Sequence, residues 1–168
     1  MSLFLTIREM HKVLGQFNVW FDKAVAHASA RKFDPESMLH WRLAPDMFAL
    51  PRQIQATCDQ AKFAASRAAG KEAPAHTDTE TTIAELRARI ASVMTYLDTF
   101  KAPDFDGAGD RMLSLPRWEG KKMTALDYVT EHAMPNFFFH ATTTYLLLRH
   151  NGVDVGKRDF LGPLNFRT

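Results

Sequence analysis

The sequence predicts an all-α protein built as a four-helix bundle. Four segments carry apolar residues at alternating steps of three and four, which is the spacing of one face of a helix. Each segment is followed by a glycine or a proline suited to end it. The connection between the third and fourth segments is long, as in bundles with a crossover. At 168 residues the chain is long enough for one domain with its own core, which we expect to span residues 1–168.

The first helix is expected to begin at Leu3 and to reach about Ala28. Its apolar positions form one stripe along about eight turns. They are Leu3, Ile7, Met10, Leu14, Phe17, Phe21, Ala24 and Ala28. The tripeptide Phe33-Asp34-Pro35 should end it.

The second helix is expected to begin near Pro45 and Asp46, where a negative charge suits the helix N-terminus, and to end at Gly70. Pro51 should either kink this helix or mark its true start, because proline lacks the backbone N–H. Lys62 and Ser66 are interpreted as part of a solvated face.

The third helix has a clear start signal. Thr82 and Glu85 have the spacing of a capping box, in which each side chain accepts from a backbone N–H of the other residue. An apolar stripe follows from Ile83 to Phe100, and Pro103 ends it.

Residues 103–123 are expected to form a long connection, because glycine, proline and aspartate interrupt its short apolar pieces. A small β-hairpin could join 111–115 to 121–123. Thr124 and Asp127 can then cap a short helix that ends near Met134.

The fourth main helix is expected from Pro135, which suits a first turn, to Gly152, which suits a helix end. Apolar residues cover nearly its whole circumference, so it should lie in a core or an interface. The segment after it, residues 154–168, should pack back irregularly onto the bundle.

Two polar residues, Asn136 and His140, lie one turn apart within this apolar helix. A buried amide and a buried imidazole need hydrogen-bond partners. If Gln55 and Asp59 of the second helix face the fourth helix, the four side chains share a cavity. The sequence therefore predicts a small-molecule pocket between helices two and four, with Gln55, Asp59, Asn136 and His140 as ligand-binding residues.

A tight metal site is not expected. None of the seven histidines pairs with another one turn away on a helix, and Asn136 stands where a partner of His140 would be. Considered alone, His140 is better interpreted as a core histidine that is hydrogen-bonded to a backbone carbonyl or to a neighbouring helix. Cys58 is interpreted as a small core residue, because no nearby cation would activate it. We expect neither a metal nor another cofactor.

Composition argues against nucleic acid and membrane partners. The net charge is only +2, and basic residues alternate with acidic ones without a basic block. No segment approaches the run of about 20 apolar residues that spans a bilayer. The lone Cys58 excludes an internal disulfide. The expectation is a soluble, cytoplasmic protein.

Several segments resemble an uncharacterised bacterial domain family within the DinB/YfiT-like superfamily. Together they span most of the chain, and the last three are the more specific. They are Arg42-Leu43-Ala44-Pro45-Asp46-Met47, Gln53-Ile54-Gln55 with Asp59 and Ala61-Lys62, Pro135-Asn136-Phe137-Phe138-Phe139-His140, Arg149-His150-Asn151-Gly152-Val153 and Gly156-Lys157-Arg158-Asp159-Phe160. The resemblance implies an up-down-down-up four-helix bundle that is often dimeric.

The resemblance also implies a degenerate metal site. Better-studied members of the superfamily bind a divalent metal with one histidine on helix two and two histidines, spaced by four, on the last helix. His140 matches the second of that pair, and Asn136 stands in the place of the first. The helix-two histidine maps close to Gln55 or Ala56.

We therefore expect a homodimeric bundle that binds a small molecule without a tight metal. Whether it is an enzyme stays open at this point. One alternative is a metal- or thiol-dependent transferase or isomerase, in which Asn136 and a carboxylate replace the lost histidines and His140 is a ligand or general base. The other is a structural or partner-binding bundle whose polar pair only fixes the helix register.

Overall fold

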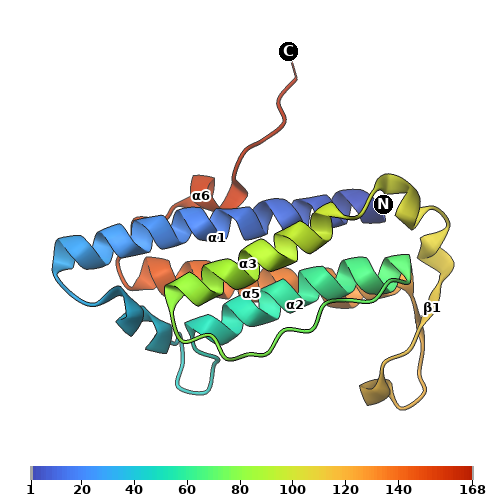
Figure 1. The fold of residues 1–168 in the computed structure, drawn as a ribbon, viewed down its shortest axis with the longest axis horizontal. Coiled ribbons are helices and arrows are strands. Elements are labelled where there is room, and N and C mark those ends of the chain that lie inside the picture. Colours follow the sequence, from blue (N-terminus) through green and yellow to red (C-terminus); the bar gives the residue numbers. More distant parts are fainter. Residues whose placement is uncertain (1, 168) are drawn as a thin grey trace.

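The structure, a computed structural model, describes residues 2–167 and is a bundle of four long helices (Figure 1). They are α1 (Leu3–Arg31), α2 (Leu50–Ala69), α3 (Ile83–Asp98) and α5 (Met134–His150). Helices α1 and α5 run in one direction and α2 and α3 in the other. The predicted four-helix bundle and its up-down-down-up arrangement are confirmed.

Short elements connect these helices. They are the 3₁₀ helices η1 (Pro35–His40), η2 (Ala102–Phe105), η3 (Ala108–Asp110) and η4 (Pro116–Trp118), the strands β1 (Met112–Leu113) and β2 (Met123–Thr124), the helices α4 (Ala125–Asp127) and α6 (Lys157–Leu161), and the π-helix η5 (Tyr128–Ala133). The two strands pair antiparallel. The long connection between α3 and α5 thus contains the expected small hairpin.

The core lies between the four helices, and α1 supplies much of it. All eight residues of the α1 stripe are buried, as their spacing predicted. Trp20 lies beside this stripe and is also fully buried. Its indole Nε1 donates to the backbone carbonyl of Asp159, at 3.1 Å, so that α1 also holds the segment after α5.

The second helix begins later than Pro45 and Asp46, and that predicted start is wrong. Residues 41–49 form an irregular loop, and α2 begins at Leu50 with Pro51 in its first turn. The missing N–H of proline has no partner to lose there, so Pro51 marks the start of the helix rather than a kink. Gly70 ends α2 with a φ of 67°.

The capping box of α3 is confirmed, with the Thr82 hydroxyl accepting from the Glu85 N–H at 3.1 Å. Because α2 and α3 run parallel, the chain between them must return along the length of the bundle. The segment from Gly70 to Thr82, called the strap below, does so in an extended conformation alongside α2 (Figure 1).

The fourth main helix does not open at Pro135, as the sequence had suggested. A continuous helical segment runs from Ala125 through η5 into α5. Within η5 the turns are wider than in an α-helix, and the Met134 N–H donates to the carbonyl of Val129, five residues back. Just beyond Pro135, the Asn136 side chain donates to the carbonyl of His132, at 2.9 Å, which satisfies an acceptor near the proline.

The end of the chain packs only in part. Phe160 of α6 stacks on Trp20 with ring centroids 5.7 Å apart, as expected of a segment that returns to the bundle. Leu164 and Phe166 are exposed, however, and residues 163–167 lead away from the helices (Figure 1). Within residues 2–167, no helix combines the length and the hydropathy needed to cross a membrane.

Candidate functional site

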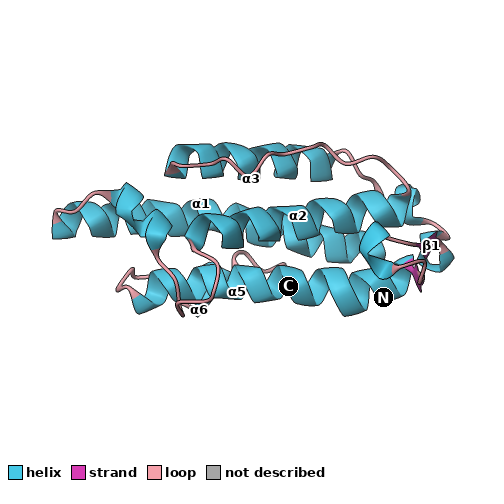
Figure 2. Ribbon diagram, turned by 90° about the horizontal axis from the view of Figure 1, so that it is seen from below, coloured by secondary structure: helices cyan, strands magenta, loops and turns pink. Residues whose placement is uncertain are grey.

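Helix α2 presents polar side chains toward two sides of the bundle. Successive residues of an α-helix point about 100° apart, so residues two positions apart point to nearly opposite sides. Gln53 and Gln55 are both buried, and they differ in what they contact. Gln53 bonds to His140 of α5, whereas Gln55 bonds to Glu80 of the strap. Figure 2 shows α2 between the layers that contain α3 and α5.

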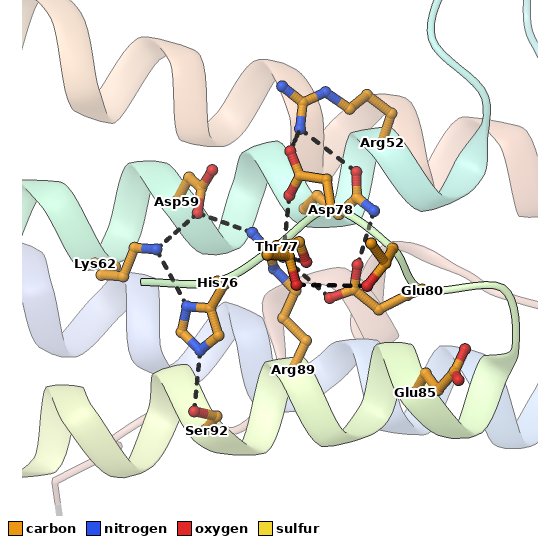
Figure 3. A network of polar contacts seen from close by, with 12 residues as sticks. Arg52, Asp59, Lys62, His76, Thr77, Asp78, Glu80, Glu85, Arg89 and Ser92 are labelled. Atoms are coloured by element: carbon orange, nitrogen blue, oxygen red, sulfur yellow. Dashed lines mark hydrogen bonds and ion pairs between the residues drawn. The ribbon is translucent and has the colours of Figure 1, made fainter. Parts of the chain in front are cut away.

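On the strap side, Arg89 of α3 is the centre of an ion-pair network (Figure 3). Its side chain is only 1% exposed, and its guanidinium lies 2.9 Å from Asp59 of α2 and 3.0 Å from both Asp78 and Glu80 of the strap. Burial disfavours the charged form, yet the hydrogen bond to Glu80 and the charge of Asp59 hold the pKa of Arg89 above its ordinary value. The strap is thus fastened across α2 and α3 by a buried cation.

A second buried cation belongs to the same network. Lys62 is 2% exposed, and its ammonium lies 3.0 Å from Asp59 and 3.1 Å from Nδ1 of His76. Ser66, one turn further along α2, is also buried. The interpretation of Lys62 and Ser66 as a solvated face is therefore wrong, because the strap covers this side of α2.

Ser92, His76 and Asp59 are residue types found in hydrolase triads, but Lys62 changes their chemistry. An ammonium only donates, so Lys62 donates to Nδ1 of His76 and the ring hydrogen lies on Nε2. Nε2 then donates to the Ser92 hydroxyl, at 3.1 Å, and has no lone pair to accept its proton. Burial, followed by the charges of Lys62 and Arg89, lowers the pKa of His76. We interpret this network as structural.

On the opposite side of α2, Gln53 orients His140. The Gln53 Nε2 donates to the backbone carbonyl of Phe48, at 3.1 Å, which turns the amide oxygen toward the imidazole. That oxygen lies 2.7 Å from Nδ1 of His140, and because a carbonyl only accepts, Nδ1 carries the ring hydrogen. Nε2 of His140 therefore keeps its lone pair and has no hydrogen-bond partner among residues 2–167.

The surroundings of His140 are aromatic and cationic. The ring of Phe48, itself 49% exposed, stacks nearly parallel to the imidazole, and Phe139 meets the imidazole edge-on. The guanidinium of Arg52 lies 5.6 Å from the centre of the Phe48 ring. Burial, and then the charge of Arg52, lowers the pKa of His140, so the imidazole is neutral near pH 7.

Asn136 lies one turn before His140 on the same side of α5. Its Nδ2 is engaged by the carbonyl of His132, which leaves the amide oxygen without a hydrogen-bond partner among residues 2–167. Both residues are half-buried, whereas the sequence had predicted that they are buried.

The four residues predicted to line one pocket lie in two groups. Asn136 and His140 share one side of α5, next to α2. Gln55 and Asp59 bond to the strap and to Arg89, on the other side of α2. The structure thus brings the four together in pairs and does not gather them around one space.

Sequence reasoning missed Gln53 and Arg89. For Arg89 a signal was present, because this charge lies on the apolar side of the helix, three residues after Leu86 and four before Val93. For Gln53 the only signal was its place in the family-like segment. The sequence had predicted that Gln55, two residues further along α2, faces His140. Which of the two glutamines faces α5 depends on how α2 is rotated about its own axis.

Comparison with known proteins defines the class of this bundle. The chain is similar to a DinB family member protein from Shewanella denitrificans, known from its crystal structure, with a TM-score of 0.94 and 45% sequence identity. The match covers 100% of this chain and 99% of that chain. The predicted membership of the DinB-like class is confirmed.

Within that class the family can be stated. Residues 4–161 match the model of DUF1993, a domain of unknown function, and the chain therefore belongs to this family. No curated protein matches the chain significantly.

The divalent metal implied by the DinB-like fold does not fit the residues present. Asn136 and His140 stand where the resemblance places the paired histidines, and the ligand on α2 was expected at Gln55 or Ala56 rather than at Gln53, the residue that contacts His140. Two amides and one imidazole are in any case a weak set of ligands. The Gln53 oxygen is already engaged by the imidazole. Among the residues described, no group of three or more His, Cys, Asp and Glu side chains could hold a metal ion. This donor set suits hydrogen bonding to a ligand better than coordination of a cation.

We expect Arg89→Ala to lower the free energy of unfolding by about 3–5 kcal/mol, because it removes a buried guanidinium that pairs with three carboxylates. Urea unfolding followed by circular dichroism measures this. Arg87→Ala is the matched control on the same helix, since its partner Asp22 is 73% exposed, and it should cost about 1 kcal/mol or less. Equal losses in both variants would contradict the stabilising role of the network.

A gain of function tests the placement of Gln53. The double variant Gln53→His, Asn136→His puts imidazoles at the two positions beside His140, and we expect it to bind one Zn²⁺ per chain in a calorimetric titration. The control is Gln55→His with Asn136→His, which follows the position expected from sequence. Because Gln55 faces Glu80, this control should bind no stoichiometric Zn²⁺. Equally tight binding in the control would refute the assignment.

Proposed function

We propose that the protein binds a small organic molecule at the exposed side of the α2–α5 seam, with Nε2 of His140 as the hydrogen-bond acceptor. The observation that carries this proposal is the 2.7 Å contact between Gln53 Oε1 and His140 Nδ1, which fixes the tautomer. A neutral imidazole held in one tautomer offers its lone pair in a defined direction. Gln53 acts here as a positioning residue.

The surroundings favour a ligand with an apolar body and a hydrogen-bond donor. Phe48 offers exposed ring surface next to the imidazole. The Asn136 oxygen is a further acceptor on the same side of α5. Arg52 adds a positive charge that would favour an acidic substituent, and Gln55 and Asp78 hold its guanidinium in place. Of the predicted residues, Asn136 and His140 would thus contact the ligand, and Gln55 would act indirectly by holding Arg52.

A fragment screen by ligand-observed NMR tests this proposal. We expect small aromatic alcohols and hydroxy acids to bind, and His140→Gln to weaken the hits by about tenfold, the effect of one hydrogen bond of about 1.4 kcal/mol. His150→Gln, at an exposed position on the same helix, is the matched control and should bind as the natural protein does. Hits that bind both variants equally would refute the site.

The pH dependence provides a second check on the same hits. Burial and Arg52 lower the pKa of His140, so Nε2 remains an acceptor at pH 7 and becomes protonated only below the ordinary histidine range near about 6.5. Affinity should therefore be constant above that value and should fall as the pH decreases through the lowered pKa. An affinity that rises on acidification would contradict an acceptor role.

We also propose that the chain forms a homodimer through the exposed side of α5. Phe139 and Leu146 are 56% and 43% exposed, and their spacing of seven residues places them on one side of the helix. Large apolar side chains that share an exposed helix side are typical of a covered interface.

Sedimentation velocity measures the oligomeric state of the protein. We expect a dimer that Leu146→Asp converts to a monomer, because a buried carboxylate without a partner opposes association. Leu5→Asp is the control, since Leu5 is 66% exposed on α1 and lies outside this interface. A monomeric natural protein, or a dimer that survives Leu146→Asp, would refute the proposed face.

A further inference from the structure

Two arginines at the hairpin end of the bundle have no carboxylate partner among residues 2–167. Arg67, near the end of α2, donates to the Tyr128 hydroxyl at 2.6 Å. Arg117, on η4, donates to Nε2 of His132 at 2.7 Å. Within residues 2–167, neither guanidinium forms an ion pair. Both are therefore cations whose partners in this cluster are neutral.

The π-helix η5 brings these two contacts together. Tyr128 and His132 stand one turn apart in η5, and their rings stack with centroids 5.3 Å apart at an interplanar angle of 20°. Trp118 of η4 packs against both rings, at 6.1 and 6.3 Å. The stacked pair thus fixes the places at which the two guanidiniums are held.

The cluster has hydrogen-bond donors in excess. Because Arg117 donates to Nε2 of His132, the ring hydrogen of this imidazole is on Nδ1, which is buried and has no partner among the described residues. The Tyr128 oxygen accepts from Arg67, and its own hydrogen meets no acceptor there. Each guanidinium uses one of its five N–H groups in these contacts. What the cluster lacks is an acceptor.

The pKa of His132 agrees with this excess of donors and positive charge. Burial, then the charges of Arg117 and Arg67, lowers the pKa of His132, and no acidic residue acts on it. Within residues 2–167, no carboxylate lies within ion-pair distance of Arg67 or Arg117. Arg117 is exposed, so the cluster is open to solvent on the η4 side. In contrast, the buried cations Lys62 and Arg89 both have carboxylate partners.

We propose that Arg67 and Arg117 form a binding site for a small oxyanion, the phosphate or carboxylate group of a small molecule. Guanidinium groups recognise both through paired, charge-assisted hydrogen bonds. An oxyanion between them would accept from the remaining N–H groups of both guanidiniums and would supply a negative charge. This site lies at the η5 and η4 end of the bundle, apart from His140 and Gln53, and does not depend on the ligand proposed there.

NMR titration tests this site, with the indole signal of Trp118 as the reporter. Inorganic phosphate, succinate and chloride are added separately at equal ionic strength. A saturable shift with phosphate, with succinate or with both supports the site and identifies the source of the oxyanion. Shifts that are absent, or that are the same in all three salts, would overturn it.

Variants distinguish specific binding at Arg67 and Arg117 from non-specific attraction of anions to the charged surface. Arg117→Gln removes an exposed charge and should weaken the oxyanion by at least about tenfold, as expected for one charge-assisted hydrogen bond. Lys122→Gln removes the same charge from the same hairpin and should leave affinity within about twofold. Arg67→Lys keeps the charge but loses the paired donors, and should also weaken binding. Equal affinity in Arg117→Gln and Lys122→Gln would refute the proposal.

Discussion

The arrangement of α2, α3 and the strap depends on the ion pairs of the buried Arg89 guanidinium. A cation at 1% exposure requires nearby negative charge, and the structure supplies it from α2 and from the strap. Because α2 and α3 are parallel, a connection must run the length of the bundle, and the ion pairs hold that connection in place. Of the strap residues, Asp78 also contacts Arg52, whose charge acts on His140.

Polar residues on both sides of α2 separate two kinds of chemistry. Toward the strap, charges are paired with opposite charges. Toward α5, the imidazole of His140 is held by the neutral amide of Gln53 and keeps one nitrogen available. Only the second arrangement leaves a functional group that a ligand can engage, which is why the proposed site lies on that side.

Local signals predicted most of the fold. The α1 stripe, the Thr82 capping box and the hairpin each depend on residues close together in sequence, and each is confirmed. The start of α2 was misplaced because Pro45 and Pro51 carry the same signal. The site was predicted only in part. The rotation of α2 about its axis decides that Gln53 rather than Gln55 faces His140, and the partners of Arg89 come from two other segments, α2 and the strap.

The π-helix has a consequence for comparison among relatives. Its wide turns accommodate one residue more than an α-helix of the same length. A relative that lacked one residue between positions 128 and 133 could form a regular α-helix of the same length there, and the residues on both sides would keep their orientation around the axis of α5. The loop that carries Arg117 would then stay on the same side of the molecule. A single-residue gap in an alignment at this point would therefore signal the loss of the π-helix rather than a rotated or shorter helix.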